Sequence, residues 1–474
     1  MSKYDYNIIV IGGGAAGLVS SYIASATNAK VALIEKHKMG GDCLNTGCVP
    51  SKALIRSAKM LSYSKRAKEF GFKSSEIDFD FSDVMDRVQT IVKKIEPHDS
   101  MDRYRKLGVD CIEGEAKILS PHTVKVNEET ISARSIIVAT GAKPLVPPIE
   151  GLDKIDYLTS DNLWQLKKLP KNLVVLGGGP IGVEMAQSFA RLGSKVTIIE
   201  MAPQILIRED EEVIELTTKH FEKEGIEVLT NHKAKSFNGN KLICDNNNKD
   251  IKIEFDKIII ALGRKPNITG FGLEELGVKI RKQGTIEANG FLQTNISNIY
   301  VCGDVTGPYQ FTHTAAHQAW YASVNALFSP FKKFKVDYSV IPWTTFTDPE
   351  IARVGINEKE AKERRIPYEV TKYEIDDLDR AITDSEAKGF IKVLTVPNKD
   401  KILGVTIVGT HAGDIIAEYI LAMKYGLGLK KILGTIHIYP TLTESNKYVA
   451  GNWQKNHKPE LILSLLKKFH SWRR

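Results

Sequence analysis

The feature that most constrains the fold is an apolar strand followed by closely spaced glycines, which occurs twice in the chain. The first copy is DYNIIVIGGGAAG at residues 5–17, and the second is NLVVLGGGPIG at residues 172–182. Each copy contains G-x-G-x-x-G and leads into a helical pattern and a second apolar strand, with a glutamate 18 residues after the last glycine. A lone glycine motif is a weak signal, but strand, glycines, helix, strand and acid in register predict a dinucleotide-binding βαβ unit.

The glycines of each motif have separate expected roles. The first allows the tight turn after the strand, the second lets a pyrophosphate approach the backbone, and the third lets helix and strand pack closely. The helix N-terminus supplies N–H groups and a positive dipole end for the phosphates, and the glutamate can accept hydrogen bonds from a ribose. These residues are Gly12, Gly14, Gly17 and Glu35 in the first copy, and Gly177, Gly179, Gly182 and Glu200 in the second.

A further repeated pattern marks the ends of the two nucleotide-binding halves. IIVATG at 136–141 and IIIALG at 258–263 are apolar strands, each stopped by Gly and then Pro. We therefore predict an α/β fold with two Rossmann-like dinucleotide-binding domains, one inserted in the other, plus a C-terminal α+β domain. The expected ranges are 1–148 for the first part of the first domain, 149–266 for the second domain, 267–337 for the return to the first, and 338–474 for the C-terminal domain.

Composition restricts the partners and the compartment. The chain is 42% hydrophobic and 26% charged, as in globular proteins, and it contains no run of 18 apolar residues, so no transmembrane helix is expected. The net charge of +8 is spread along the chain, whereas nucleic-acid binding prefers a basic cluster, so no nucleic-acid partner is expected. A strand that begins at once leaves no room for a signal peptide, and five cysteines are too few for a secreted disulfide framework. These points predict a cytoplasmic protein.

The most specific stretch is GGDCLNTGCVPSK at residues 40–52, which places Cys43 and Cys48 shortly after Glu35. A zinc half-site would more often use C-x2-C and would need a second pair, so no metal site is expected. A redox-active disulfide next to a bound flavin is the sharper hypothesis. His313 and His317 have a spacing that can chelate metal on a helix, but no HExxH pattern accompanies them. The remaining cysteines, expected to be small buried residues, are Cys111, Cys244 and Cys302.

These motifs together resemble those of one family, the class I pyridine nucleotide–disulfide oxidoreductases, which include dihydrolipoamide dehydrogenase, glutathione reductase and mercuric reductase. The resemblance runs from about Tyr4 to about Pro459, and it rests on both glycine fingerprints, GGDCLNTGCVPSK, VATG, ALGRKPN, CGDV and a C-terminal YPTLTE. It implies a homodimeric FAD enzyme whose C-terminal domain forms the dimer interface.

The resemblance also implies which residues bind the cofactors. Lys52 would lie by the flavin, pair with Glu184 and help to tune the flavin. A carboxylate at Glu200 would accept a hydrogen bond from the 2′-OH of NAD and repel the 2′-phosphate of NADP, so NADH is favoured, while Arg208 leaves NADPH open. The implied FAD residues are Gly12, Gly14, Gly17, Glu35, Lys52, Ala116, Thr140, Gly141, Asp304 and Thr312, and the implied NAD(P) residues are Gly177, Gly179, Gly182, Glu200 and Gly263.

One departure from the family pattern bears on the substrate. Dehydrogenases and glutathione reductases of the family carry His before Pro, with Glu five positions after the His, and this His is the acid–base group supplied by the other subunit. Here HIYPTLTE at 437–444 keeps Glu444 but has Tyr439 at the histidine position. A phenol with a pKa of about 10 is a poor general base at neutral pH. His437 is a less favoured alternative base: it could swing in as a substitute, but two residues upstream it would point elsewhere on an extended segment.

Mercuric reductases resemble this chain in having tyrosine at that place, although they usually end in a vicinal cysteine pair and this sequence ends FHSWRR. The family mechanism would pass electrons from NAD(P)H through FAD to a Cys43–Cys48 disulfide, with Cys48 nearer the flavin and Cys43 facing the substrate. Tyr439 and Glu444 of the other subunit would line the substrate face. The expected acceptor is a soft metal ion or its thiol complex. A small disulfide or dithiol such as lipoamide is the alternative, and a non-enzymatic flavoprotein subunit is a third, which the intact cysteine pair opposes.

The C-terminal segment has the pattern of an amphipathic helix. Packing of its apolar stripe on its own domain is expected, and contact with a membrane surface is the less favoured alternative. The stripe consists of Leu461, Ile462, Leu465, Leu466, Phe469 and Trp472, and the basic residues opposite or at its end are Lys467, Lys468, Arg473 and Arg474.

Overall fold

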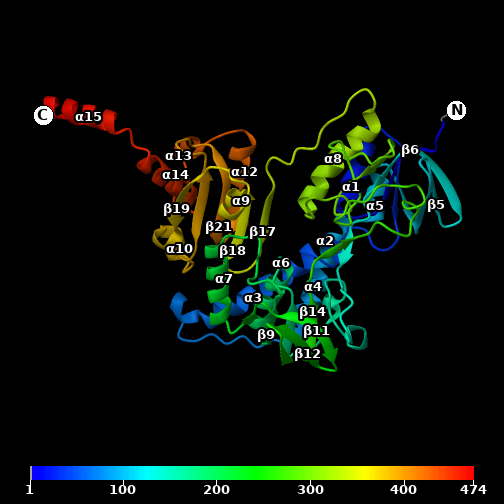
Figure 1. The fold of residues 1–474 in the computed structure, drawn as a ribbon, viewed down its shortest axis with the longest axis horizontal. Coiled ribbons are helices and arrows are strands. Elements are labelled where there is room, and N and C mark those ends of the chain that lie inside the picture. Colours follow the sequence, from blue (N-terminus) through cyan, green and yellow to red (C-terminus); the bar gives the residue numbers. More distant parts are fainter. Residues whose placement is uncertain (1–2) are drawn as a thin grey trace. The chain divides into compact units, whose positions relative to one another are not determined.

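The computed structural model describes residues 3–474, which form two compact units (Figure 1). Unit 1 consists of the described part of Met1–Ser62 together with Ile77–Pro203 and Gly225–Asp337. Unit 2 consists of Tyr63–Glu76, Gln204–Glu224 and Tyr338–Arg474. Each unit is therefore assembled from segments that are distant in the sequence.

The first sheet of unit 1 has a parallel core in the order β3–β2–β1–β6, and β16 pairs in parallel with β6. Strand β6 also continues antiparallel into β5 and β4. Because β16 follows the second sheet in sequence, the chain returns to its first sheet after an insertion. The strands are β1 (Tyr6–Ile11), β2 (Val31–Glu35), β3 (Val109–Glu113), β4 (Ala116–Ser120), β5 (Thr123–Val126), β6 (Glu129–Val138) and β16 (Ile299–Val301).

Two helices rich in small residues pack together beside this sheet (Figure 1). They are α1 (Ala15–Ala26) and α8 (Thr312–Phe328). Ala319 and Ala322 of α8 are fully buried, and the Ser323 hydroxyl donates to the Ser20 carbonyl over 3.3 Å. Small side chains at this contact let the two helix backbones approach closely, which fixes the start of α8 relative to the first glycine motif.

The second sheet of unit 1 repeats the plan of the first, with the parallel order β10–β9–β8–β14 and a separate antiparallel meander β11–β12–β13. Strands β7 and β15 form a short antiparallel pair. The prediction of an α/β fold with two Rossmann-like sheets, one inserted in the other, is confirmed. The elements are β7 (Ala142–Pro144), β8 (Asn172–Leu176), α6 (Pro180–Leu192), β9 (Lys195–Ile199), β10 (Glu227–Leu229), β11 (Lys233–Asn238), β12 (Lys241–Asn246), β13 (Lys249–Glu254), β14 (Lys257–Ile260) and β15 (Arg264–Pro266).

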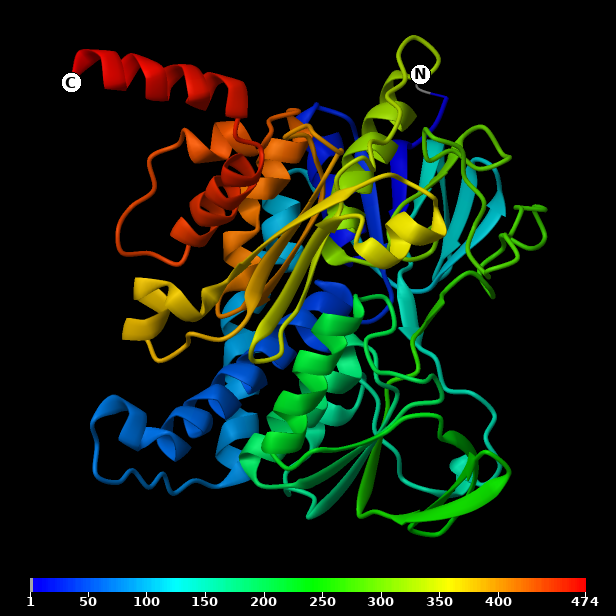
Figure 2. The same cartoon turned by 60° about the vertical axis from the view of Figure 1, so that its left-hand side comes forward.

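Unit 2 is built on a five-stranded antiparallel sheet in the order β17–β18–β21–β20–β19, drawn in yellow and orange in Figure 2. Helix α14 packs on β19 and β20, and its Trp453 is almost fully buried in the core. The C-terminal region therefore has the predicted α+β architecture. The elements are β17 (Pro342–Thr345), β18 (Glu350–Gly355), α9 (Glu358–Glu363), β19 (Glu369–Glu374), α10 (Asp379–Thr383), β20 (Phe390–Thr395), β21 (Ile402–Gly409), α11 (Ala412–Ile415), α12 (Ala417–Lys424), α13 (Leu429–Leu433), α14 (Glu444–Asn456) and α15 (Glu460–Arg473).

Shorter elements complete the two units. The remaining α-helices are α2 (Gly41–Asn45), α3 (Cys48–Lys65), α4 (Phe81–Ile95), α5 (Met101–Lys106) and α7 (Glu211–Lys223). The 3-10 helices are η1 (Ala67–Phe70), η2 (Glu96–His98), η3 (Leu152–Lys154), η4 (Leu163–Gln165) and η5 (Ile375–Asp377).

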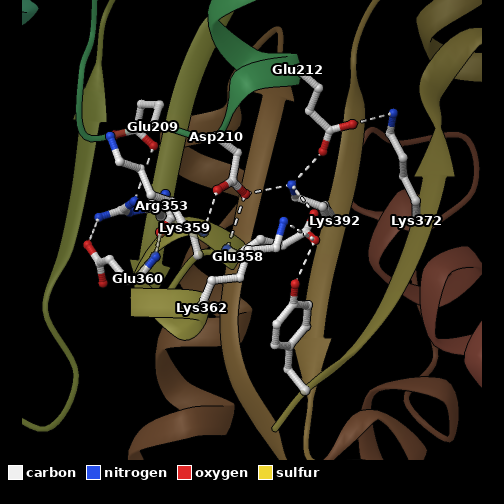
Figure 3. Close-up of polar contacts among 12 residues, drawn as sticks. Glu209, Asp210, Glu212, Arg353, Glu358, Lys359, Glu360, Lys362, Lys372 and Lys392 are labelled. Carbon is white, nitrogen blue, oxygen red and sulfur yellow. Dashed lines mark hydrogen bonds and ion pairs between the residues drawn. The ribbon is translucent and has the colours of Figure 1, made fainter. Parts of the chain in front are cut away.

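A buried ionic network attaches the segment before α7 to the sheet of unit 2 (Figure 3). Lys392 on β20 has a side chain that is only 2% exposed, and its Nζ lies 2.6 Å from Asp210 Oδ2, 2.5 Å from Glu212 Oε1 and 2.9 Å from Glu358 Oε1. Arg353 on β18 is equally buried. Its Nη1 donates to the carbonyl of Arg208 over 2.7 Å, so a residue of β18 fixes the backbone just before α7.

The C-terminal helix does not pack as expected. None of the residues of α15 is buried, and Leu461 and Trp472 are 83% and 82% exposed. The expectation that the apolar stripe packs on its own domain is therefore wrong. Among the residues that the structure describes, no helix combines the length and the apolar character needed to cross a membrane.

Candidate active site

The cysteine pair lies at a break between two helices. Cys43 is in the middle of α2, and Cys48 is the first residue of α3. Gly40 and Gly41, at the start of α2, have left-handed backbone, and a Cβ on Gly41 would lie only 2.7 Å from the Cα of Gly14. The backbone N–H of Gly40 also donates to the carbonyl of Gly13 over 2.9 Å. The two glycines thus hold the cysteine loop directly against the first glycine motif.

The environment of Cys48 favours a thiolate. A hydrogen bond from Cys43 lowers the pKa of Cys48 to about 6, assisted by a hydrogen bond with Thr312 and the charge of Lys52, while burial opposes the change. The position at the N-terminus of an 18-residue helix also favours a negative charge. The same hydrogen bond, followed by burial, raises the pKa of Cys43 far above its ordinary value. These shifts favour the charge on Cys48 and the proton on Cys43.

The two side chains named as partners of Cys48 come from different elements. Thr312 is the first residue of α8, and its Oγ1 lies 3.4 Å from Cys48 Sγ. Lys52 lies one helical turn after Cys48 on α3, and its Nζ lies 2.9 Å from Oε2 of the buried Glu184 on α6. The ion pair between Lys52 and Glu184 therefore joins the cysteine helix to the helix that follows the second glycine motif.

The two nucleotide-binding motifs share one hydrogen-bond pattern. Glu35 accepts hydrogen bonds from the N–H of Gly13 over 2.6 Å and from the N–H of His37 over 2.7 Å. Glu200 accepts from the N–H of Gly178 and from the N–H of Ala202, both over 2.7 Å. Each carboxylate is thus fixed beside its glycine turn, and each oxygen retains a lone pair with which a ribose hydroxyl can bond.

The glycine turns leave room where a dinucleotide needs it. Gly12 and Gly177 have φ values of +108° and +113°. A Cβ on Gly12 would collide with the carbonyl oxygen of Ala139, and a Cβ on Gly177 with that of Ala261, each just after the neighbouring strand of the sheet. Likewise, a Cβ on Gly17 or Gly182 would collide with the carbonyl of Gly12 or Gly177. By contrast, a Cβ on Gly14 would meet nothing nearer than 3.8 Å, and one on Gly179 nothing within 4 Å. The first and third glycines are therefore needed for close backbone packing, and the second leaves open space in which a pyrophosphate could lie.

The helices that follow these turns have open N-termini. α1 and α6 begin after Gly14 and Gly179, neither helix has a side-chain cap, and neither has an acidic residue in its first turn. Unpaired N–H groups at such a terminus attract phosphate. The residues present therefore fit a dinucleotide at both places.

Three implied FAD positions cluster around the ends of β2 and β6. Ala116 begins β4, just after Gly114, whose N–H donates to the carbonyl of Glu35 over 2.9 Å. The Thr140 hydroxyl donates to the Asn267 carbonyl over 2.6 Å, and the N–H of Asn267 donates to the carbonyl of Gly141 over 3.0 Å. Asn267 therefore fixes the turn after β6.

Arg264 connects Asp304 to the cysteine loop. Its Nε lies 3.4 Å from Asp304 Oδ2, and its Nη2 forms an ion pair with Asp42, the residue before Cys43. Burial raises the pKa of the Asp304 carboxyl, and the charge of Arg264 opposes the rise. Arg264 was not among the predicted site residues, although it follows Gly263 within the ALGRKPN motif.

The segment with Tyr439 lies in unit 2. The Tyr439 hydroxyl donates to Asp379 Oδ2 over 2.9 Å, and this hydrogen bond raises the pKa of the exposed phenol. The His437 ring is turned inward, with Nδ1 at 3.1 Å from the Thr435 carbonyl and Nε2 at 3.1 Å from Glu418 Oε2. Both ring nitrogens of His437 are therefore already engaged within the chain. Glu444, the first residue of α14, is buried and accepts from the N–H of Thr441 over 3.2 Å.

The three isolated cysteines are all buried, as predicted for small core residues: Cys111, Cys244 and Cys302. The ring of His317 is used within unit 1, where Nε2 lies 3.0 Å from the carbonyl of Asp337. Within residues 3–474, no three His, Cys, Asp or Glu side chains gather in a way that could hold a metal ion.

Two family models match the chain. The model described as pyridine nucleotide-disulphide oxidoreductase matches residues 6–319, and the dimerisation domain of the same family matches residues 341–450. The chain belongs to this family. Membership makes it an FAD-dependent disulfide oxidoreductase with a dimerisation domain, and the sequence-based family prediction is confirmed.

Relatives within the pyridine nucleotide–disulfide oxidoreductases include two kinds of enzyme. The chain is 36% identical over 461 residues to the mercuric reductase of Lysinibacillus sphaericus, covering 96% of this chain and 84% of that protein. It is 34% identical over 450 residues to the dihydrolipoyl dehydrogenase of Chlamydia muridarum, covering 93% and 95%. Among solved structures, the HOCl-induced flavoprotein disulfide reductase RclA from Escherichia coli superimposes with a TM-score of 0.84 at 27% identity, covering 94% of this chain and 99% of that one.

Proposed function

We propose that the protein takes electrons from NADH and delivers them through the Cys43–Cys48 disulfide to a soft metal ion or its thiol complex. The observation that carries the proposal is that neither Tyr439 nor His437, in the segment 437–444, is available as a base. The Tyr439 phenol donates to Asp379 and has a raised pKa, and the His437 ring has partners at both nitrogens. A dithiol substrate needs a base to take its proton, whereas a soft metal ion that binds the Cys43 sulfur itself displaces the thiol proton to solvent.

The cofactors would be held by the two glycine turns with Glu35 and Glu200, where open helix N-termini face the phosphates. FAD, when bound, supplies the relay of an electron pair between the nicotinamide and the disulfide. The remaining proposed FAD contacts are Lys52, Ala116, Thr140, Gly141, Asp304 and Thr312, and Gly263 joins the nicotinamide cofactor site. NADH is preferred in this proposal because the fixed Glu200 carboxylate would repel a 2′-phosphate.

The cysteines carry the redox step. Two electrons and a proton open the disulfide and leave Cys48 as a thiolate and Cys43 as a thiol. When the disulfide forms again, the two electrons pass to the acceptor and the Cys43 proton is released. The lowered pKa of Cys48 keeps it charged at neutral pH, so Cys43 is the thiol that is left for the acceptor.

The ion pair of Lys52 and Glu184 has a positioning role in this scheme. Lys52 contributes positive charge near Cys48, and Glu184 balances that charge from a buried position on α6. The ion pair therefore holds a positive charge in place near the Cys48 thiolate.

The domain ranges belong to the same proposal. We assign 1–148 and 267–337 to an FAD domain, 149–266 to an NAD(P) domain and 338–474 to the dimer interface. In a homodimer of this family, the segment with Tyr439 and Glu444 of one subunit would face the cysteine pair of the other.

A disulfide or dithiol such as lipoamide is the second candidate, because Glu444 is retained and dihydrolipoyl dehydrogenases match over nearly the whole chain. A metal acceptor draws further support from a relative, since RclA from Escherichia coli has been solved as a Cu(II) complex at 27% identity to this chain.

The experiment that separates the two candidates is steady-state NADH oxidation, without oxygen, against Hg²⁺, Cu²⁺, lipoamide and glutathione disulfide. Metal turnover should exceed disulfide turnover and should be lost in Cys43→Ser and in Cys48→Ser. Tyr439→His should raise lipoamide turnover by about 10²- to 10⁴-fold near pH 7–8, because an imidazole replaces a phenol as the acid–base group.

Two variants control this measurement. Tyr448→His makes the same change on the exposed side of α14 and should give no gain. The gain of Tyr439→His should disappear when Glu444→Gln is added, since that carboxylate would orient the new imidazole. Wild-type lipoamide turnover that exceeds metal turnover and is unchanged by Tyr439→Phe would overturn the proposal in favour of the dithiol candidate.

A further inference from the structure

Helix α15 presents a continuous apolar face, and none of its residues is buried. The spacing of four, four and three residues from Leu461 through Leu465 and Phe469 to Trp472 aligns them along one side of a helix. Leu465 is 65% exposed and Phe469 45% exposed, in addition to the nearly bare Leu461 and Trp472. Contiguous apolar surface of this kind marks an interaction site, whereas single exposed leucines do not.

Basic side chains surround this face: Lys468 and Arg473 lie at its two edges, and Lys467 lies on the far side of the helix. Lys467, Lys468 and Arg473 lie within α15, and Arg474 follows it, against one acidic residue, Glu460. A helix with leucine and aromatic residues on one face and lysine and arginine bordering that face has the composition of helices that lie in the headgroup region of a bilayer. Lysine and arginine side chains can lay their apolar stems along the lipid and keep the charge at the phosphates.

A second copy of the chain fits this face less well. Each tail carries four lysine and arginine side chains against one glutamate, so two tails repel, whereas an anionic lipid surface attracts them. The helix of 14 residues is about 21 Å long. Its one apolar face could bury far less surface than a specific protein interface, which buries about 800 Å² on each partner. The matched dimerisation domain ends at residue 450, before α15 begins.

The length of the helix adds a further argument. An isolated helix of about 12–15 residues is only marginally stable in water, and its stability in proteins comes from packing of the apolar face. α15 has no buried residue to supply that packing. A lipid interface would supply it without requiring a shaped protein surface.

We propose that α15 lies in the surface of an anionic lipid bilayer. Leu461, Leu465, Phe469 and Trp472 enter the boundary of the acyl chains, while Lys467 and Lys468 contact lipid phosphates. The helix thereby holds a peripheral enzyme at a membrane without spanning it. This role is independent of the acceptor that the cysteine pair reduces.

The test is co-sedimentation of the full-length, FAD-loaded protein with vesicles of phosphatidylcholine, alone or mixed with phosphatidylglycerol. The protein should bind the mixed vesicles and not the neutral ones, and binding should weaken as salt rises. Phe469→Ser with Leu465→Ser should abolish binding. Each of Lys467→Gln and Lys468→Gln should weaken it about fivefold, as expected for one charge near an anionic surface. Ser464→Gln, which leaves the charge unchanged, should bind as the wild type does.

Flavin content and NADH oxidation should be equal in all of these variants, because α15 has no buried contact with the rest of the chain. Absence of binding to mixed vesicles would overturn the proposal. Size-exclusion chromatography without lipid gives a second test. If the Phe469→Ser, Leu465→Ser protein elutes as a smaller species than the wild type, the proposal is overturned and the face is assigned to a second copy of the chain.

Discussion

Replacement of Lys392 by methionine tests the ionic network that attaches the segment before α7 to the sheet of unit 2. Methionine has nearly the same length and volume as lysine, so packing is largely kept. The variant removes an ammonium that lies within 2.5 to 2.9 Å of three carboxylates, those of Asp210, Glu212 and Glu358. The Lys392 side chain is 2% exposed, so water cannot replace the lost partner.

Removal of one partner from a buried ion pair costs about 3–5 kcal/mol, and we expect a loss of that order in the free energy of unfolding. Lys372→Met is the matched control, because Lys372 contacts Glu212 over 3.0 Å and Glu374 over 2.8 Å but has a side chain that is 34% exposed. Pairs of that kind contribute up to about 1 kcal/mol. Urea unfolding of both variants, followed by circular dichroism, measures the difference.

The pH dependence provides a second readout. In the wild type the pKa of Glu212 is lowered: burial alone would raise it, but the hydrogen bond from Lys392 leads the effects that lower it. A lowered pKa stabilises the fold above the unfolded-state value of about 4.3, and this stabilisation is lost as pH falls through the folded-state pKa. In Lys392→Met the carboxylates repel one another, and acid relieves the repulsion. The stability gap between the two proteins should therefore narrow below about pH 4. Equal losses in Lys392→Met and Lys372→Met, or a gap that widens in acid, would refute the reasoning.

Two further predictions concern the cofactor sites. Glu200→Ala should raise the KM for NADH by about 10- to 100-fold, because a charged hydrogen bond is lost, and should reduce the difference in kcat/KM between NADH and NADPH. A wild-type protein with a higher kcat/KM for NADPH than for NADH would contradict the role given to Glu200. Gly41→Ala should lower the flavin content of the purified protein, read from its absorbance, because the new Cβ would lie 2.7 Å from the Cα of Gly14. Gly426→Ala also adds a Cβ at positive φ, with nothing within 4 Å, and should retain its flavin; equal flavin content in both variants would speak against the contact.

The parts of the fold that could be predicted from sequence are those with short-range signals. The glycine motifs fix strand, turn and helix within about 20 residues of one another, and both copies have the predicted order. The carboxylates of Glu35 and Glu200 lie beside the glycine turns, as their spacing from those turns suggests. The isolated cysteines could be assigned to the core because single buried cysteines behave as small apolar residues.

The parts that could not be predicted depend on partners that are distant in sequence. Nothing near Lys392 in the chain indicates that Asp210 lies beside it, and a lysine on a strand would ordinarily be assigned to the surface. Arg264 beside Asp304 and Asp379 beside Tyr439 are similar cases. The amphipathic pattern of α15 correctly indicates a helix, but a pattern cannot say what covers the apolar face.

The most direct test of the central claim, that Cys48 is the charged member of the reduced pair, is the absorbance of the two-electron-reduced protein as a function of pH. A thiolate beside oxidised flavin gives a long-wavelength band. With the pKa of Cys48 lowered to about 6, this band should be present at pH 7–8 and lost as pH falls through about 6. Cys43→Ser should show the band without reductant, and Cys43→Ala, which lacks the hydrogen-bond donor, should lose it at higher pH. Cys48→Ser should show no band. A band that survives Cys48→Ser and disappears in Cys43→Ser would contradict the account.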